Sequence, residues 1–206
     1  MDILKPLISW KGDLTPLNKN GIEGIALHHM AHPSWTFEEV HRGHLNRGWI
    51  GIGYNFWVGF DGKVYEGRGF NIGAGVKGEN STVLSIGFQG NFEVQTMPEA
   101  QFNAGVELIK WLQTQLPKAR IIHGHKHWAA TACPGKNFPL LEMIKAISEP
   151  VKEVENVVKV VLEGKEIGEG KIIDGTTYLP VRALAEALNL AVAWNAKTKT
   201  VSIAKK

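Results

Sequence analysis

The histidines and the cysteine of this chain are confined to its first two thirds, and this uneven distribution constrains the fold more than any other feature. All eight histidines lie between His28 and His127, and the single cysteine is Cys133. After Pro150 the chain contains neither residue type and becomes rich in valine and lysine. A short polar stretch over 148–153 separates the two parts and is typical of a linker. The distribution predicts two domains, with the reactive side chains gathered in the first.

Length and composition agree with this division. The chain has 206 residues, of which 44% are apolar and 21% are charged, close to the average of globular proteins. These values exclude a disordered, collagen-like or coiled-coil chain, and a single cysteine excludes an intramolecular disulfide. We expect a first domain over 1–148, a linker over 149–156 and a small second module over 157–206.

Charge and hydropathy exclude two classes of partner. The formal net charge of +3 at pH 7 is too small a surplus to indicate nucleic acid. No window approaches the ~20 apolar residues that a transmembrane helix needs, so we expect no membrane partner. The first residues contain neither a basic start nor an uninterrupted apolar run, unlike a signal peptide. We therefore expect the protein to be made in a host cytoplasm without a signal peptide.

Short apolar runs intermixed with helical periods predict an α/β fold for the first domain. The predicted strands are 24–30, 54–60, 63–66, 83–88 and 120–123, and the predicted helices run from 36 to 47, from 96 to 116 and from 140 to 147. Thr36-x-x-Glu39 and Thr96-x-x-Glu99 fit capping boxes that begin the first two helices. We expect a mixed central sheet of about five or six strands, covered by helices.

The last part of the chain predicts a separate α+β module. An apolar run over 157–162 and a turn at Glu163-Gly164 indicate a hairpin, which a helix over Val181–Leu188 follows. Two further strands flank residues 195–199. The resulting ββαββ module has about fifty residues and is marginal in stability by its size alone.

The segment that contains Cys133 carries the residue types of a zinc site. Three histidines between positions 123 and 127 precede Cys133 by six to ten residues, and His28-His29 offers a nitrogen from a separate strand. Zinc takes thiolate and imidazole ligands, and a catalytic site keeps three protein ligands and one open position. Because side chains alternate along a strand, only one of His28 and His29 points into such a site, and spacing does not say which.

Two other interpretations of Cys133 are open at this point. A lone buried cysteine is commonly a small inert apolar residue. A Cys–His nucleophilic hydrolase needs one histidine as its base, and it leaves the other histidines unexplained. The crowding of eight histidines beside the only cysteine favours the metal site.

Four sequence blocks follow one another along the first domain. They are Ile25-Ala-Leu-His-His29, Gly51-Ile-Gly-Tyr-Asn-Phe56, Asp61-Gly-Lys-Val-Tyr-Glu-Gly-Arg-Gly69 and Gly124-His…Thr131-Ala-Cys-Pro-Gly135. Together they resemble the zinc-dependent N-acetylmuramoyl-L-alanine amidase family, which includes phage endolysins and the animal peptidoglycan recognition proteins. The resemblance covers roughly residues 20 to 145, and the order of the blocks makes it specific.

The resemblance implies a zinc ion bound by His28, His125 and Cys133, with His29 facing away from the metal. Two neutral imidazoles and one thiolate leave a net charge of +1 on such a site, so the ion stays a Lewis acid. The chain departs from the family pattern at three places; the first removes a common carboxylate beside the metal ligands, and the other two leave the identity of a general base open. Lys126-His127 stands where Arg-Asp is frequent, Gly75 where many relatives have histidine, and Gln89 where some phage amidases have glutamate.

The resemblance also implies roles for side chains around the metal. Tyr54 matches the active-site tyrosine of the family, and Thr131 matches a position that holds Lys or Thr. We expect both to donate hydrogen bonds to the oxyanion of the tetrahedral intermediate. Trp35, His44 and Arg68 are expected along the groove for glycan or peptide.

The implied reaction is hydrolysis of the amide between the lactyl group of N-acetylmuramate and L-alanine in bacterial peptidoglycan. We expect a phage or prophage endolysin that acts at the bacterial cell wall after release from the host. The alternative is a related domain that recognises peptidoglycan fragments without cutting them.

The second module resembles a different family. Val157-Val-Lys-Val-Val-Leu-Glu-Gly-Lys165, the stretch from Ile173 to Glu186, and Thr200-Val-Ser-Ile203 are similar to the copper amine oxidase N-terminal-like or stalk domain of cell-envelope proteins. Residues 151–206 contain no His, Cys or Met, so we expect no copper site there. The expected roles are attachment to the cell wall, or a spacer that forms a homo-oligomer.

Overall fold

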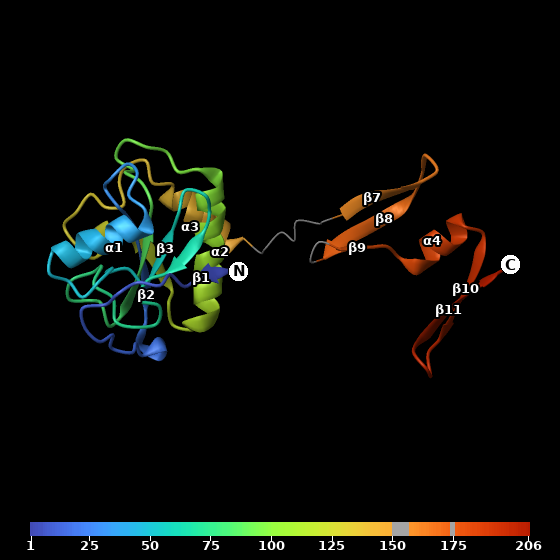
Figure 1. Ribbon diagram of the computed structural model, residues 1–206, viewed down its shortest axis with the longest axis horizontal. Helices are drawn as coiled ribbons and strands as arrows, with labels where there is room; N and C mark the ends of the chain where they lie inside the picture. Colours follow the sequence, from blue (N-terminus) through green and yellow to red (C-terminus); the bar gives the residue numbers. More distant parts are fainter. Residues whose placement is uncertain (150–156, 174–175) are drawn as a thin grey trace. The chain divides into compact units, whose positions relative to one another are not determined.

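The computed structural model describes residues 1–149, 157–173 and 176–206. The chain divides into two compact units, Met1–Glu149 and Pro150–Lys206 (Figure 1). The linker predicted over 149–156 lies outside the described residues except for Glu149. Within the described ranges, none of the helices combines the length and the apolar character that crossing a bilayer requires.

The first unit is built on one mixed sheet of six strands, which confirms the predicted fold class. The strands are β1 (Ile3–Leu4), β2 (Gly24–His29), β3 (Phe56–Val58), β4 (Val64–Glu66), β5 (Val83–Phe88) and β6 (Ile121–Gly124). Their order across the sheet is β1-β4-β3-β5-β2-β6. Only β3 and β4 pair antiparallel within it, around the predicted Asp61-Gly62 hairpin. Two neighbouring interior strands, β5 and β2, are buried along their whole length.

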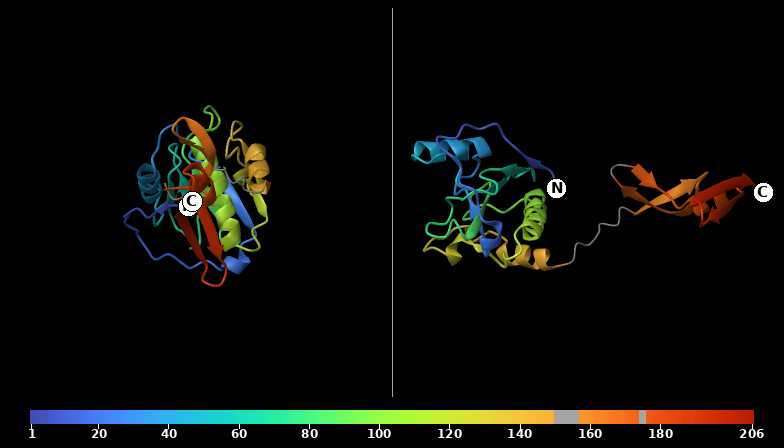
Figure 2. Two further views of the ribbon diagram at one scale, coloured as in Figure 1. Left: turned by 90° about the vertical axis from the view of Figure 1, so that its right-hand side faces the viewer. Right: turned by 90° about the horizontal axis from the view of Figure 1, so that it is seen from below.

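Helices cover both faces of this sheet, with α1 on one side and α2 and α3 on the other (Figure 1 and Figure 2). They are α1 (Phe37–Asn46), α2 (Glu99–Gln115) and α3 (Leu140–Ser148), with short 3-10 turns η1 (Lys19–Gly21) and η2 (His125–His127). Ile25 and Leu27 of β2 lie in the core with the apolar side chains of α2 and α3. Ala26 lies on the other face, in a smaller cluster with Val83. Strand alternation therefore separates a helix-covered core from the face that carries the site.

One of the two predicted capping boxes is present and the other is wrong. At α1 the Thr36 hydroxyl accepts from the Glu39 amide, and the Glu39 carboxylate accepts from the Thr36 amide. At α2 the N-cap is Pro98, and no side chain bonds to the helix end. A residue before proline is disfavoured in the α region, so Met97 stays outside the helix and Thr96 is too far away to cap it.

The second unit contains one strand more than predicted. β7 (Val157–Leu162), β8 (Lys165–Ile173) and β9 (Thr176–Tyr178) form an antiparallel sheet, α4 (Val181–Ala187) follows, and β10 (Leu190–Asn195) pairs with β11 (Thr200–Lys205). The extra strand β9 pairs with the end of β8. Its Thr-Thr-Tyr sequence is rich in strand-favouring residues, and the prediction of ββαββ overlooked it.

We expect Thr36→Ala to lower the free energy of unfolding of the first unit by about 1 kcal/mol, because it removes the α1 cap. Thr96→Ala is the matched control, and it should change that free energy by less than about 0.5 kcal/mol. Urea unfolding followed by tryptophan fluorescence measures both, since six of the seven tryptophans lie in this unit. Equal losses for the two variants would contradict the assignment of the cap.

Candidate metal centre and active site

Strand β2 presents its two histidines to opposite faces of the sheet. The His28 side chain is buried on the α1 face, where its ring lies against those of Tyr54 and His125. His29 points to the other face, where its Nδ1 accepts a hydrogen bond from the Phe92 amide at 3.1 Å. The ambiguity that spacing left open is thus decided by the fold, and His28 alone of the pair lies at the site.

Three side chains from different elements meet at this site: His28 from β2, His125 from η2 and Cys133 from the loop after η2. Their ligand atoms all lie within 4.8 Å of one another. The Cys133 Sγ is 3.8 Å from the His28 Nδ1, and the two imidazole centroids are 4.5 Å apart. A tetrahedral zinc ion places a sulfur and a nitrogen ligand about 3.6 Å apart, so this donor set fits zinc.

The loop that carries Cys133 is closed on itself by short backbone contacts. The Lys126 amide donates to the Cys133 carbonyl at 2.9 Å. The Cys133 amide donates to the Thr131 hydroxyl oxygen at 3.2 Å. Lys126 and Thr131 thereby fix the cysteine next to η2, where His125 lies. Thr131 itself is exposed, and since its oxygen is the acceptor here, its own O–H remains available as a donor.

Burial sets the protonation states of the metal-free cluster. Burial, and next the neighbouring His125, hold the pKa of His28 well below its usual value, and burial also lowers the pKa of His125. Both imidazoles are therefore neutral near pH 7 and offer a lone pair. Burial raises the pKa of the Cys133 thiol to about 11. A nucleophilic cysteine needs a lowered pKa, so this environment argues against the Cys–His hydrolase.

The second ring nitrogen of His28, Nε2, is buried in the tightly packed region around Gly75 and Ser85. In the described part of the chain, neither His28 Nε2 nor the buried Ser85 Oγ has a hydrogen-bond partner. A Cβ on Gly75 would lie 2.4 Å from Ser85 Oγ and 3.1 Å from His28 Nε2. Histidines that bind metal usually donate their second N–H to an oxygen, but His28 Nε2 makes no such bond among the described residues. A histidine at position 75 would overlap Ser85, so this position holds no base here.

Tyr54 lies beside the cluster because a glycine makes room for it. Its ring centroid is 5.1 Å from that of His28 and 5.6 Å from that of His44. A Cβ on Gly87, which pairs with His28 across the sheet, would lie 2.8 Å from the Tyr54 ring. Burial, and next Cys133, raise the pKa of Tyr54 above its usual value. The phenol therefore stays protonated at neutral pH, and it is a hydrogen-bond donor.

The residues predicted to line a groove differ in what they contact. The His44 Nδ1 accepts from the Gly53 amide at 3.0 Å, and burial lowers the pKa of His44 to about 4, with Arg47 and Arg68 adding to the shift. His44 is thus neutral at pH 7, with Nε2 as its donor. Trp35 stacks on His32 at 4.7 Å and packs against α1. A role of either side chain in substrate binding stays a prediction.

Arg68 has backbone partners within its own unit. Its Nε donates to the Ile52 carbonyl at 2.8 Å, and its Nη1 donates to the Ile72 carbonyl at 3.1 Å. The side chain is buried and ties together two loops next to Tyr54. These contacts are typical of a structural residue, and a contact of Arg68 with substrate stays a prediction.

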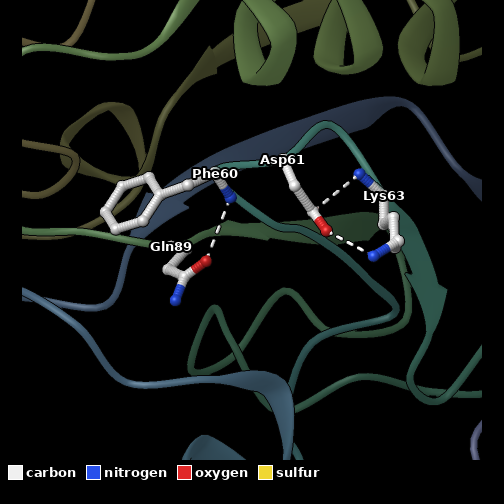
Figure 3. Close-up of polar contacts among 4 residues, drawn as sticks. All are labelled: Phe60, Asp61, Lys63 and Gln89. Carbon is white, nitrogen blue, oxygen red and sulfur yellow. Dashed lines mark hydrogen bonds and ion pairs between the residues drawn. The ribbon is translucent and has the colours of Figure 1, made fainter.

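Gln89 is held by loop backbone. Figure 3 shows its Oε1 accepting from the Phe60 amide at 3.0 Å, beside the Asp61–Lys63 pair that closes the β3–β4 turn. Its Nε2 donates to the Ser34 carbonyl at 3.0 Å. The amide thus joins the segment before α1 to the β3–β4 turn. Among the described residues, Gln89 makes positioning contacts and no hydrogen bond to His28, His125 or Cys133.

Asn55 is a structural residue of the site that the sequence analysis missed. It is fully buried, its Nδ2 donates to the carbonyls of Gly69 and Asn71, and its Oδ1 accepts from the Ser85 amide. These bonds fix the segment that carries Tyr54 to the strand that carries Ser85. The available signal was polarity, since an asparagine or a serine inside an apolar strand must find partners when it is buried.

Loss of a residue that only hydrogen-bonds to a metal ligand weakens metal binding by about 10–100-fold. We expect His28→Gln to weaken zinc binding by more than this, because it removes a ligand itself. His29→Gln is the matched control from the opposite face of β2, and it should keep stoichiometric zinc. Metal content after dialysis, with affinity from competition against a chelator, measures both. Unchanged zinc in His28→Gln would remove His28 from the ligand set.

We expect the Cys133 thiol of the folded, metal-free protein to react with iodoacetamide about a hundredfold more slowly at pH 8 than the same thiol in denaturant, because burial raises its pKa from 9.0 to about 11. Only the thiolate reacts, so the rate in the folded protein should rise about tenfold per pH unit up to that pKa. Mass spectrometry of the alkylated chain gives the rates. Fast alkylation of the folded protein at pH 7 would restore the nucleophilic interpretation.

Comparison with known proteins identifies a family for each of the two parts of the chain. Residues 18–136 match the family model described as N-acetylmuramoyl-L-alanine amidase, and residues 161–206 match the model described as copper amine oxidase N-terminal domain. Peptidoglycan-recognition protein SC2 of Drosophila melanogaster is 42% identical over 94 residues, which are 44% of this chain and 51% of that protein. Peptidoglycan-recognition protein SC1a of the same organism is 38% identical over 107 residues, 50% of this chain and 58% of that protein. The chain thus spans about half the length of these relatives.

Solved structures extend the likeness to the fold. The endolysin N-acetylmuramoyl-L-alanine amidase LysCS from Clostridium intestinale is 28% identical, with a TM-score of 0.65 over 70% of this chain and 93% of that one. Bumblebee PGRP-SA is 29% identical, with a TM-score of 0.62 over 69% of this chain and 93% of that one. The family match covers more than half of the chain, and it includes the His28–His125–Cys133 cluster. The chain belongs to the N-acetylmuramoyl-L-alanine amidase family and carries a copper amine oxidase N-terminal-like domain at its C-terminal end.

Proposed function

We propose that this protein is a zinc-dependent N-acetylmuramoyl-L-alanine amidase that hydrolyses the amide between the lactyl group of N-acetylmuramate and L-alanine in peptidoglycan. The observation that carries the proposal is the His28–His125–Cys133 cluster, with a protonated Tyr54 beside it. A domain that only recognises peptidoglycan has no need of three neutral or ionisable metal donors within 4.8 Å of one another. Family membership and peptidoglycan-recognition relatives support the substrate class.

The residues around the cluster supply what amide hydrolysis requires. Zinc bound there supplies Lewis acidity to the scissile carbonyl and to the attacking water. The Tyr54 phenol donates a hydrogen bond toward the carbonyl oxygen as negative charge develops on it, and the Thr131 hydroxyl is a second donor at the exposed side. Neutral His44 donates from Nε2 to an uncharged acceptor of the substrate, such as a peptide or acetamido carbonyl.

We further propose that the enzyme is a phage or prophage endolysin, which acts at the bacterial cell wall after release from the host cell. The likeness to a clostridial endolysin over 93% of that chain supports this role. The amidase unit here is joined to a second domain, as expected of a modular wall hydrolase.

The second candidate is a recognition domain that binds peptidoglycan without cutting it. The relatives named peptidoglycan-recognition proteins favour it. The two candidates differ in turnover, because a recognition domain retains muropeptide and releases no product.

The deciding experiment measures new amino termini and free muramic-acid lactyl ends released from purified peptidoglycan. The protein is assayed as prepared, after chelation, and after zinc is added back. Activity that falls with the chelator and returns with zinc is expected of the amidase. Stoichiometric zinc with bound muropeptide and no released termini would support the recognition domain. Cleavage that continues at an unchanged rate after chelation would contradict the zinc mechanism.

We expect Tyr54→Phe to keep zinc and to lower turnover by about 10²–10³, because one oxyanion donor is lost. Tyr65→Phe is the matched control. Tyr65 stacks on Phe37 at 5.3 Å, lies in the α1 cluster and makes no contact with the metal ligands among the described residues. Steady-state rates on soluble muropeptide, with metal content measured in parallel, compare the two variants. Equal turnover of Tyr54→Phe and the unmodified protein would remove Tyr54 from the mechanism.

A further inference from the structure

A second cavity of the first unit lies beside the candidate active site. It has a volume of about 460 Å³ and is lined by parts of β6, η2, the loop after Cys133 and the first turn of α3; we call it the β6–α3 pocket. Its polar lining residues are His123, Lys126, Lys136 and Glu142. The candidate metal ligands and oxyanion donors are not among the lining residues, so the reaction proposed above leaves this pocket unused.

Two lysines give the β6–α3 pocket an excess of positive charge. Lys126 and Lys136 are exposed, and neither forms an ion pair in the described part of the chain. Glu142 supplies the one carboxylate of the lining, and it too has no ion pair there. Two cations against one anion leave a formal charge of +1 before His123 is counted. The pocket therefore matches a ligand with a single negative charge.

The first turn of α3 adds hydrogen-bond donors to the pocket. The N-cap is Pro139, no side chain caps the helix, and the amides of Leu141 and Glu142 have no acceptor among the described residues. Free amides at the start of a helix favour a bound anion. The ring of His123 also lines the pocket. Its Nδ1 is buried without a partner, so Nε2 is the nitrogen that a ligand can reach.

The rest of the lining is apolar. Pro134, Phe138, Leu140 and Leu141 supply it, and Leu141 is 77% exposed. A water molecule occupies about 30 Å³ in the liquid, so a pocket of about 460 Å³ has room for an anionic group and for the uncharged groups attached to it. The lining therefore indicates an anion that carries a carbon chain.

The arrangement of the donors favours a phosphate group over a carboxylate. They come from three directions: the lysines of η2 and of the Cys133 loop, the imidazole of β6, and the amides of α3. The two oxygens of a carboxylate lie in one plane, whereas the four oxygens of a phosphodiester form a tetrahedron. Lysines, backbone amides and helix N-termini are common partners of phosphodiester oxygens. A phosphodiester also carries the single negative charge that the lining matches.

We propose that the β6–α3 pocket binds a phosphodiester group of an anionic polymer in the cell wall. Lys126 and Lys136 neutralise the phosphate, the α3 amides and His123 Nε2 donate to its oxygens, and the apolar residues contact the carbon chain. The inference rests on the proposed function only for the place where the protein meets this polymer. Because η2 and the Cys133 loop belong both to the pocket and to the metal cluster, a bound polymer holds the candidate active site at the wall.

The first test titrates the full-length, zinc-loaded protein, labelled with ¹⁵N, with glycerophosphoglycerol, a single phosphodiester between two glycerols. We expect the amide signals of Leu141 and Glu142 to shift and to saturate. Lys136→Gln should raise the dissociation constant about tenfold, because one charge-assisted contact is lost. Lys118→Gln is the matched control. It removes the same charge from an exposed lysine outside the pocket, and it should leave the constant unchanged.

A second ligand in the same titration separates phosphate from carboxylate. N-acetyl-D-alanyl-D-alanine carries the same single charge on a carboxylate with short apolar groups. We expect it to bind at least tenfold more weakly than the phosphodiester, because its planar group meets fewer of the donors.

The third measurement uses purified cell walls, before and after hydrofluoric acid has removed their phosphodiester polymers. The fraction of protein that sediments with the walls is compared between the two lysine variants. Lys136→Gln should bind untreated walls more weakly than Lys118→Gln, whereas both variants should bind treated walls equally.

Four outcomes would overturn the proposal. They are the absence of shifts at Leu141 and Glu142, equal losses in the two lysine variants, carboxylate binding as tight as phosphodiester binding, and shifts centred on Tyr54 and Thr131. The last outcome would place the phosphate at the candidate active site. Each of them leaves the chelator-sensitive release of amino termini untouched, so failure of this inference is distinguishable from failure of the proposed function.

Discussion

The alternation of side chains along one buried strand is the constraint on which the rest of the structure depends. β2 lies between two parallel neighbours, and its residues must therefore satisfy two different surroundings in turn. Ile25 and Leu27 enter the helix-covered core, and His28 enters the opposite face. A shift of one residue in register would bury His29 at the site and expose the core, so the register that buries the core also places His28 in the candidate metal cluster.

Desolvation then determines the chemistry at this face. The same burial that keeps two imidazoles neutral keeps the Tyr54 phenol protonated and the Cys133 thiol unreactive. All of these effects favour uncharged groups, as expected where water is excluded. The metal-free site is consequently assembled from neutral groups, and a metal ion bound there would bring its charge. A cysteine nucleophile would need the opposite environment.

Features of the fold that depend on local sequence pattern were predicted correctly. The buried strands, the Thr36 cap of α1 and the Asp61-Gly62 hairpin are short-range features, and the structure contains them. The second capping box is wrong because Pro98 restricts the residue before it. Tertiary contacts could not be predicted because they join residues that are far apart in the sequence. Spacing could not reveal that Gln89 bonds the segment before α1, or that Asn55, just before β3, bonds Ser85 of β5, which lies 30 residues later in the sequence.

The close approach of Gly75 to Ser85 and His28 has a consequence for how this family can vary. A Cβ at position 75 would lie 2.4 Å from the Ser85 hydroxyl oxygen, so residue 75 can become larger only where residue 85 is smaller or displaced. A relative with a bulky side chain at the first position must have a smaller or displaced residue at the second. The two positions should therefore substitute together across an alignment, although they lie on separate segments and neither binds the metal.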